Sequence, residues 1–451
     1  MTDIIQLSAI DMAAGLRAGK LTAGEVMAAH RAQVEQLEPR VNAFITLDWE
    51  AAEARAAELD AMAAKGAFAG PLHGVPVAIK DCFETKDLRT TWGSRSFAEF
   101  VPDFDAAHVA RLRAAGAVII GKTNIPEFTF SGQTSNLVSG TTRNPLDTDK
   151  TVAGSSGGAA AALAGHMVAL ADGSDLGGSV RTPAAWCGLV GFRPSSGLIP
   201  YAPNPAPFDG LSVPGPMARS VRDLVLMQQV MQGNLTGAPL GFWQEMPALD
   251  TLEAPMAPGR VALRMEPFGA RVDGSIQAAL AVLEPVLRQA GWQVEDAEPD
   301  LAPLMAHEDI IRGQCALQIR ASLAPDMDLA GESFRTACAQ AEGKSLADLI
   351  AYHTTRAGVL AEVNRFFDRY EFALWPTTTG LPFSADLADA ELPEDWRTVT
   401  LTPPLELPSI TLPCGTSSDG MPVGVHITGP KGADAKLLRF ARLLERHLSG
   451  D

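Results

Sequence analysis

Residues 154–193 read GSSGGAAAALAGHMVALADGSDLGGSVRTPAAWCGLVGFR, the most informative stretch of the 451-residue sequence. Two glycine loops carry serines here, Ser155-Ser156-Gly157-Gly158 and Gly177-Gly178-Ser179. Glycine lets backbone N–H groups approach a ligand closely, which is what an oxyanion requires. Residues 159–165 have no side chain larger than leucine, so they predict a helix packed tightly against a neighbour, followed by an apolar strand. Both serine loops are therefore expected on rigid elements.

The plain alternative for these loops is a flexible linker, because Gly-Ser runs are most often turns or linkers. Two such loops separated by a helix and a strand, and followed by the apolar segment 183–192, do not fit a linker. We therefore expect an α/β protein, a single large domain with a central mixed β-sheet covered by helices on both faces.

Composition excludes several classes of function. With 46% hydrophobic and 20% charged residues the chain can bury a large core, and its net charge of −17 gives no basic face for nucleic acid or anionic membranes. The five cysteines are scattered without metal-ligand spacing, which is typical of reduced thiols in a cytoplasmic protein. No secretion signal or membrane-spanning run is recognisable, so a soluble, cytoplasmic protein with no membrane partner is expected.

Hydrophobic periodicity predicts alternating helices and strands. Thr22 and Glu25 have the spacing of a capping box at the start of the second helix. Helices are expected over residues 8–19, 22–37, 49–65, 106–116, 220–232, 275–290 and 433–448, with several more between 301 and 368; strands are expected over 41–47, 75–80, 117–120, 260–263, 292–297, 373–376, 409–413 and 423–428.

Lys80 ends the apolar run VPVAIK and is followed by Asp81. A lysine at a strand end is usually solvated. Here it follows a segment that is expected to be buried, where desolvation keeps an amine neutral and basic. Both readings stay open on the sequence alone.

Two motifs match well-known patterns and are rejected on their context. Residues 116–123 fit the phosphate-loop pattern, but the four intervening residues are apolar and predict a strand, whereas a phosphate loop follows its strand. Residues 154–158 fit G-x-S-x-G with Ser156 as nucleophile, but no apolar strand precedes Gly154.

Several motifs together resemble the amidase signature family of Ser–cis-Ser–Lys amide hydrolases. They are VPVAIKD at 75–81, GKTNIPEF at 121–128, AGSSGG at 153–158, GSDLGGSVRTPAAWCGLVGFRPS at 173–195, GPMARSV at 215–221 and LPSITLPCGTSSDGMPVGVHITGP at 407–430. The spacings of 75 residues from Lys80 to Ser155 and 24 from Ser155 to Ser179 also agree with the family pattern.

The resemblance implies that Ser179 is the nucleophile, that Ser155, after a cis peptide, relays the proton, and that Lys80 is the base. No histidine lies in the two glycine-serine loops to replace the lysine. It further implies an oxyanion hole from Leu176, Gly177 and Gly178, with the N–H of Ser179 turned the same way, substrate contacts by Thr129, Ser131 and Ser156, and no metal or other cofactor. Asp175 and Arg181 flank the nucleophile and are expected to hold its loop or simply to form an ion pair.

The resemblance also implies an organisation along the chain. It divides the single domain into an N-terminal helical part (1–70), a signature core (71–230), a variable region that shapes the substrate pocket (235–370) and C-terminal core strands with a closing helix (371–451). Trp92, Phe130, Trp186 and Trp375 are candidates to line the pocket, or are plain core.

Two functions remain. The favoured one is a stand-alone hydrolase of a small carboxamide, because Asn124-Ile125-Pro126-Glu127-Phe128 resembles that branch of the family. The alternative is the glutamine-hydrolysing subunit of a tRNA-dependent amidotransferase, which works in a complex. A small-molecule amide is the expected partner, and a homodimer is compatible with the family; the sequence does not identify the amide.

Overall fold

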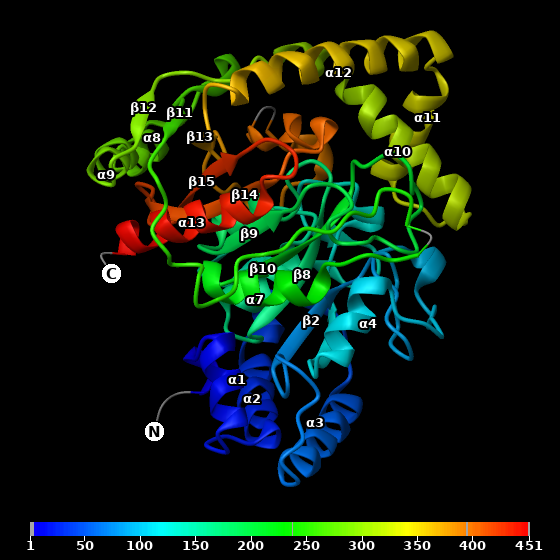
Figure 1. The fold of residues 1–451 in the computed structure, drawn as a ribbon. Helices are drawn as coiled ribbons and strands as arrows, with labels where there is room; N and C mark the ends of the chain where they lie inside the picture. Colours follow the sequence, from blue (N-terminus) through cyan, green and yellow to red (C-terminus); the bar gives the residue numbers. More distant parts are fainter. Residues whose placement is uncertain (1–3, 237, 394–395, 450–451) are drawn as a thin grey trace.

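An eleven-stranded mixed sheet runs through the centre of the protein (Figure 1). The computed structural model describes residues 4–236, 238–393 and 396–449. The strand order is β1-β3-β2-β8-β10-β9-β14-β15-β13-β11-β12. Parallel pairs join β2 to β3 and β8, and β11 to β12 and β13, and the remaining pairs are antiparallel. The predicted fold class, one α/β domain with a mixed sheet, is confirmed.

The strands are short and most are apolar, as expected for a sheet covered on both faces. Those of the central sheet are β1 (Phe44–Leu47), β2 (Pro76–Lys80), β3 (Val118–Thr123), β8 (Leu170–Asp175), β9 (Val190–Arg193), β10 (Val213–Ala218), β11 (Arg260–Leu263), β12 (Gln293–Glu295), β13 (Phe372–Pro376), β14 (Ser409–Thr416) and β15 (Pro422–Thr428). Two small hairpins pair β4 (Ser135–Asn136) with β5 (Gly140–Thr141), and β6 (Arg143–Asn144) with β7 (Asp147–Thr151).

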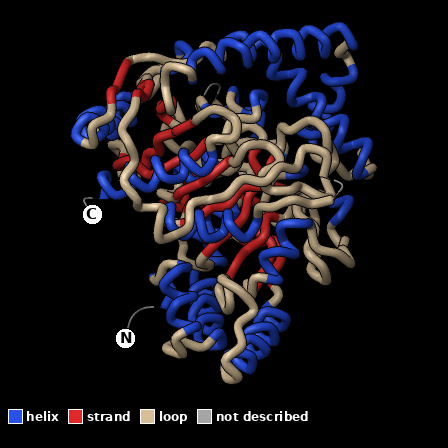
Figure 2. Tube along the Cα trace, viewed as in Figure 1, coloured by secondary structure: helices blue, strands red, loops and turns tan. Residues whose placement is uncertain are grey.

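Helices surround the sheet, and the longest loops cross the surface between residues 193 and 260 (Figure 2). The α-helices are α1 (Ala9–Arg17), α2 (Ala23–Val41), α3 (Trp49–Ala63), α4 (Ala107–Ala114), α5 (Gly157–Ala164), α6 (Arg181–Trp186), α7 (Val221–Met231), α8 (Gly274–Leu280), α9 (Leu283–Gln289), α10 (Glu308–Leu323), α11 (Glu332–Glu342), α12 (Leu346–Phe367) and α13 (Asp434–Ser449). No helix in the described ranges is long and apolar enough to cross a membrane.

Two groups of helices pack on the central strands. Helix α5 contacts β2, β3, β8 and β10, and α6 contacts β9, β14 and β15. Helices α7 and α13 contact each other and lie in front of the sheet in Figure 1, where α7 covers β8, β9 and β10. The strands that carry the glycine loops are thus held between helical layers.

Helix α5 is packed as tightly as its small residues predict. A side-chain carbon added at Gly158 would lie 2.4 Å from the backbone nitrogen of Asn124 and 2.5 Å from the carbonyl oxygen of Ala43. The loop of Ser155 and Ser156, just before this helix, is therefore positioned by direct backbone packing.

Two of the differences between the predicted and the observed element boundaries have a clear local cause. The helix expected over 275–290 is two helices, α8 and α9, because Pro285 lacks an N–H and its ring clashes with the carbonyl of residue 281, where the break occurs. The strand expected from Val41 begins at Phe44, because Asn42 ends α2 in the left-handed conformation, with φ of 54°. The capping box of Thr22 and Glu25 is present.

The structure supports the rejection of both motifs. Gly121, Lys122 and Thr123 lie inside β3, and the Lys122 amine is buried against Thr85 and Thr90, so they form no phosphate loop. The strand before Gly154 is β7, which pairs with β6, bridges Ser384 through Lys150 and is not a strand of the central sheet. Ser156 therefore does not occupy a nucleophile elbow.

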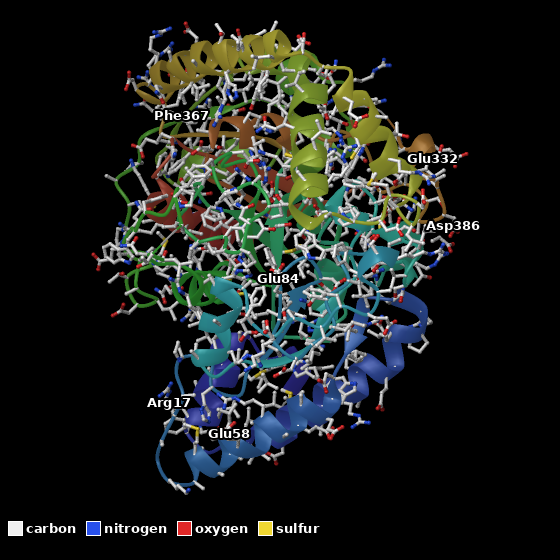
Figure 3. All side chains as sticks on the ribbon, turned by 90° about the vertical axis from the view of Figure 1, so that its right-hand side faces the viewer. Arg17, Glu58, Glu84, Glu332, Phe367 and Asp386 are labelled. Atoms are coloured by element: carbon white, nitrogen blue, oxygen red, sulfur yellow. The ribbon has the colours of Figure 1, made fainter. Side chains whose placement is uncertain are left out.

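Residues 260–376 extend the sheet and build a separate group of helices beside it. Helices α10, α11 and α12 lie at one end of the molecule, and α1, α2 and α3 at the other (Figure 1). In Figure 3, Glu332 and Phe367 mark the first end, and Arg17 and Glu58 mark the second. One face of α10 is turned toward the serine loops, because three of its residues share a cavity with them.

Candidate active site

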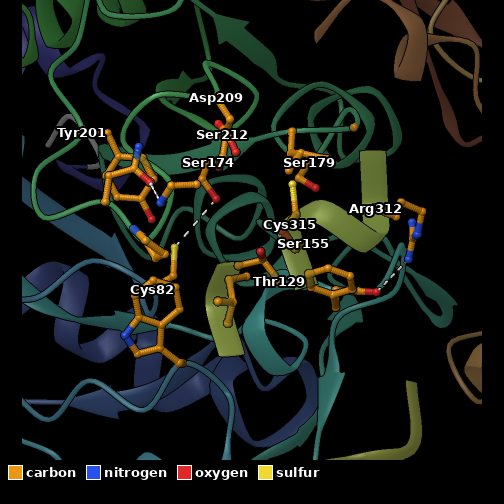
Figure 4. A pocket seen from close by; sticks show the side chains of 18 of the residues that line it. Cys82, Thr129, Ser155, Ser174, Ser179, Tyr201, Asp209, Ser212, Arg312 and Cys315 are labelled. Atoms are coloured by element: carbon orange, nitrogen blue, oxygen red, sulfur yellow. Dashed lines mark hydrogen bonds between the residues drawn. The ribbon is translucent and has the colours of Figure 1, made fainter. Parts of the chain in front are cut away.

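A cavity opens where the two glycine loops meet helix α10 (Figure 4). Its wall brings together six of the residues expected at the site, namely Thr129, Ser131, Ser155, Leu176, Gly177 and Ser179. Trp92, Phe130, Tyr201 and Ile319 supply apolar surface. These residues are far apart in the sequence, so the fold gathers them.

Lys80 is completely buried at the carboxyl end of β2. Its Nζ lies 2.8 Å from Ser155 Oγ, 2.8 Å from Ser156 Oγ and 2.9 Å from Ser174 Oγ. Burial lowers the pKa of the lysine from 10.5 to about 8, although Cys82 and Asp172 nearby raise it. The sequence leaves open whether Lys80 is solvated or buried, and the structure shows that it is buried.

The backbone of Lys80 is held as firmly as its amine. Its N–H donates to Asp172 Oδ1 at 2.6 Å, and the other oxygen of that carboxylate lies 2.8 Å from His108 Nε2. The side chains of Asp172 and His108 are both fully buried. The amine is therefore presented from a fixed point on the sheet, while Ser174 reaches it from the end of the parallel neighbour β8.

Ser155 and Ser179 lie on the wall of the same cavity, Ser155 after a cis peptide bond from Gly154 and Ser179 at the start of the turn into α6. The carbonyl oxygen of Ser179 accepts the N–H of Ser156 at 3.0 Å, which joins the two loops. No hydrogen bond between the hydroxyls of Ser155 and Ser179 is formed in this structure among the residues that it describes. Hydrogen bonds used in catalysis are often longer before substrate binds.

Two expected contacts are corrected by the geometry. Ser156, expected to touch substrate, is fully buried behind the cavity wall, where it bonds Lys80 and accepts the N–H of Ser174 at 3.3 Å. Gly178, expected in the oxyanion hole, already donates its N–H to Asp175 Oδ1 at 3.0 Å. Sequence spacing places these residues near the site but does not decide which way their polar groups point.

The other three N–H groups expected to face an oxyanion are available for one. In the described structure the backbone nitrogens of Leu176, Gly177 and Ser179 donate no hydrogen bond to the protein, and all three residues line the cavity. Gly178 makes this turn possible, with φ of 102°, and a side-chain carbon there would lie 2.3 Å from Val399 Cγ2.

Asp175 and Arg181 form a buried ion pair that also clamps the loop. The Arg181 Nε and Nη2 donate to the two carboxylate oxygens at 2.9 and 2.7 Å, and the same carboxylate accepts the N–H groups of Gly178 and Val180. Burial alone would raise the pKa of Asp175, but Arg181 holds it well below its usual range. The two roles expected from the sequence, holding the nucleophile loop and forming an ion pair, are therefore both fulfilled by this contact.

The aromatic candidates divide into two groups. Trp92 and Phe130 line the cavity. Trp186 instead stacks on Trp396 at 4.7 Å, and Trp375 packs in a separate core cluster. No group of three or more His, Cys, Asp or Glu side chains in the described ranges is arranged to hold a metal ion.

Several polar side chains of the cavity are missed by sequence reasoning, among them Ser174, Arg312 and Arg397. Ser174 lies within one of the family motifs, and its position at the end of an apolar strand next to the parallel strand of Lys80 is an available signal. The two arginines lie in segments without a recognised motif, so nothing in the sequence distinguishes them from surface arginines.

Known proteins are similar to this chain over nearly its whole length. The family model described as Amidase matches residues 25–438. A glutamyl-tRNA(Gln) amidotransferase subunit from Alkaliphilus metalliredigens (strain QYMF) is 32% identical, over 99% of this chain and 97% of that protein.

Solved structures are similar over the full length as well. The 6-aminohexanoate cyclic dimer hydrolase complexed with substrate superimposes with a TM-score of 0.88 at 28% identity, covering 99% of this chain and 98% of that one. A bacterial aryl acylamidase of the amidase signature enzymes family superimposes with a TM-score of 0.91 at 26% identity, covering 98% and 96%.

Proposed function

The chain belongs to the amidase signature family, and on that premise we propose that this amide hydrolase works through an acyl-enzyme on Ser179, with Lys80 as base and Ser155 as proton relay. The observation that carries the proposal is the buried Lys80 amine 2.8 Å from Ser155 Oγ, which shares its cavity with Ser179. A lysine in that environment is a strong base within reach of the serine relay.

The steps follow from the contacts. Neutral Lys80 takes the proton of Ser155, and Ser155 takes that of Ser179 as its Oγ attacks the amide carbon. The tetrahedral oxyanion accepts N–H groups from the Leu176–Gly177–Ser179 turn, where each essential donor is worth about 3–4 kcal/mol. The same relay returns the proton to the leaving amine, and water then repeats the attack on the ester. Substrate binding has to bring the Ser179 hydroxyl to Ser155.

Covalent labelling tests the nucleophile. A serine-directed fluorophosphonate is expected to modify one peptide, the one that contains Ser179, and Ser179→Ala is expected to abolish labelling. Ser212, which lines the same cavity but belongs to no glycine loop, provides the control variant Ser212→Ala, which should label normally. Modification at Ser156 or Ser174 in the wild type would contradict the assignment.

The curated relatives favour a second candidate. The name that they share, a glutamyl-tRNA(Gln) amidotransferase subunit, supports a glutamine-hydrolysing subunit that works with partner subunits more directly than it supports a stand-alone hydrolase. The solved neighbours named above are hydrolases. Because that name includes a tRNA, it also conflicts with the expectation of no nucleic-acid partner. That expectation rests on the net charge of −17.

Purification from the native cells separates these two candidates. An amidotransferase subunit is expected to copurify with stable partners and to hydrolyse glutamine faster with them than alone. A stand-alone hydrolase is expected to elute without other subunits and to release ammonia or an amine from small amides at full rate. An ammonia-release screen over aliphatic, aryl and dicarboxylic monoamides, ureas and glutamine, run on the isolated chain, gives the second readout.

A further inference from the structure

Two arginines of the cavity form no ion pair with an acidic side chain in the part of the protein that the structure describes. Arg312 projects from α10 on the same helical face as Cys315 and Ile319, which also line the cavity, and Arg397 comes from the segment between β13 and β14. Neither guanidinium forms an ion pair with any carboxylate in residues 4–236, 238–393 and 396–449. Both arginines are partly buried. A positive charge that is partly removed from water costs free energy unless an anion compensates it.

The contacts that the arginines do make hold them in place without neutralising them. Arg312 Nη2 donates to the carbonyl oxygen of Phe130 at 3.2 Å, and its guanidinium lies 5.7 Å from the centre of the Phe130 ring (Figure 4). Arg397 lies 5.1 Å from the centre of the Trp396 ring, and that ring is stacked on Trp186. Several N–H groups of each guanidinium therefore have no hydrogen-bond acceptor among the described residues.

The two guanidinium groups also act on each other. Desolvation, and then the positive charge of Arg312, lower the pKa of Arg397 to about 10, while Glu308, one turn before Arg312 on α10, raises it. Asp175, which is already held in its own buried ion pair, also raises this pKa. The one acidic side chain on the cavity wall, among described residues, is Asp209, and Figure 4 shows it well separated from Arg312. The cavity thus holds more positive charge than its own acidic groups compensate.

We propose that Arg312 and Arg397 form a carboxylate subsite, so that the natural substrate is an amide that also carries a carboxylate group. Planar forks are suited to bidentate contacts with a carboxylate, and the apolar walls around them strengthen such contacts by excluding water. The inference rests on the proposed hydrolysis at Ser179, because the arginines face the cavity of that serine. Glutamine carries such a carboxylate, so the subsite is compatible with either candidate function.

Matched substrates test the subsite. The monoamides of succinic and glutaric acid are compared with butyramide and valeramide, the neutral amides of the same chain lengths. The wild type is expected to have a higher kcat/KM for the acid monoamides, and Arg312→Gln and Arg397→Gln to lower it by about 10- to 100-fold, with neutral amides changed little. Arg320→Gln is the control, because Arg320 lies on the same helix but pairs with Glu342 at the surface.

Binding gives a readout that does not need turnover. Calorimetry on Ser179→Ala should show binding of glutaric monoamide, weakened about tenfold or more by either additional arginine substitution and unchanged by Arg320→Gln. Equal use of acid and neutral amides by the wild type, equal losses on both in the arginine variants, or no binding to Ser179→Ala would overturn the subsite. Binding that depends on the arginines, with no turnover of any amide by the wild type, would instead contradict hydrolysis at Ser179.

Discussion

At the scale of single residues, the position of the Lys80 amine matters most. Lys80 Nζ has three serine hydroxyls and one carbonyl as neighbours and, in the described structure, no carboxylate in direct contact. Hydroxyls can donate to a neutral amine as well as accept from a charged one, so this environment tolerates loss of the proton. A carboxylate at the same distance would instead keep the lysine charged and useless as a base.

Removing the amine should therefore remove the activity. Lys80→Ala is expected to lower kcat by about 10²- to 10⁴-fold, the usual contribution of a positioned base, with the fold retained by circular dichroism. Lys80→Met fills the same volume without a base and should lose as much, which separates chemistry from packing. Lys436→Ala, at an exposed lysine paired with Glu371, is the control. Activity close to wild type in Lys80→Met would contradict the relay.

The candidate site is predictable residue by residue only in part. Lys80, Ser155 and Ser179 are found from the sequence because the motifs and their spacing identify residue types, and the fold brings all three to one place. In the structure the N–H of Gly178, expected in the oxyanion hole, donates to Asp175, and Ser156 lies behind the cavity wall instead of on it. Such errors arise because the direction of a hydrogen bond in a glycine turn depends on tertiary contacts.

At the scale of secondary structure, α5 positions the loop of Ser155 through backbone contact. Gly158→Ala is expected to destabilise the protein by about 1–3 kcal/mol, because the added methyl would meet backbone atoms that cannot move away. Gly358→Ala is a matched control in the exposed part of α12, where nothing lies within 4 Å and alanine should stabilise by about 1 kcal/mol. Urea unfolding measures both. Equal stability of the two variants would show that α5 is not tightly packed.

Periodicity locates most helices and strands because apolar spacing reflects burial directly. The failures have local causes, a proline that divides α8 from α9 and a left-handed Asn42 that delays β1. The division into an N-terminal part, a signature core, a variable region and C-terminal strands stays a proposal. In its favour, α10 of the middle region supplies Arg312, Cys315 and Ile319 to the cavity.

At the scale of the whole molecule, the low pKa of Lys80 is a property of the assembled layers. The lysine ends a central strand that has the strands β3 and β8 on either side and helix α5 packed against it. Complete burial follows from all of these together, and burial is the main cause of the lowered pKa. None of these contacts can be deduced from the sequence around Lys80, which explains why the sequence leaves its state open.

The most direct test of a neutral lysine base is the pH dependence of kcat/KM for the isolated chain on an active amide. The lysine is charged and inactive below its pKa, so the rate should rise through about pH 8 and then level off. His73→Ala should not change this profile, because His73 accepts the N–H of Ala69 in a turn and does not line the cavity. A rise centred near pH 6.5, the ordinary pKa of histidine, that disappears in His73→Ala would contradict the lysine mechanism.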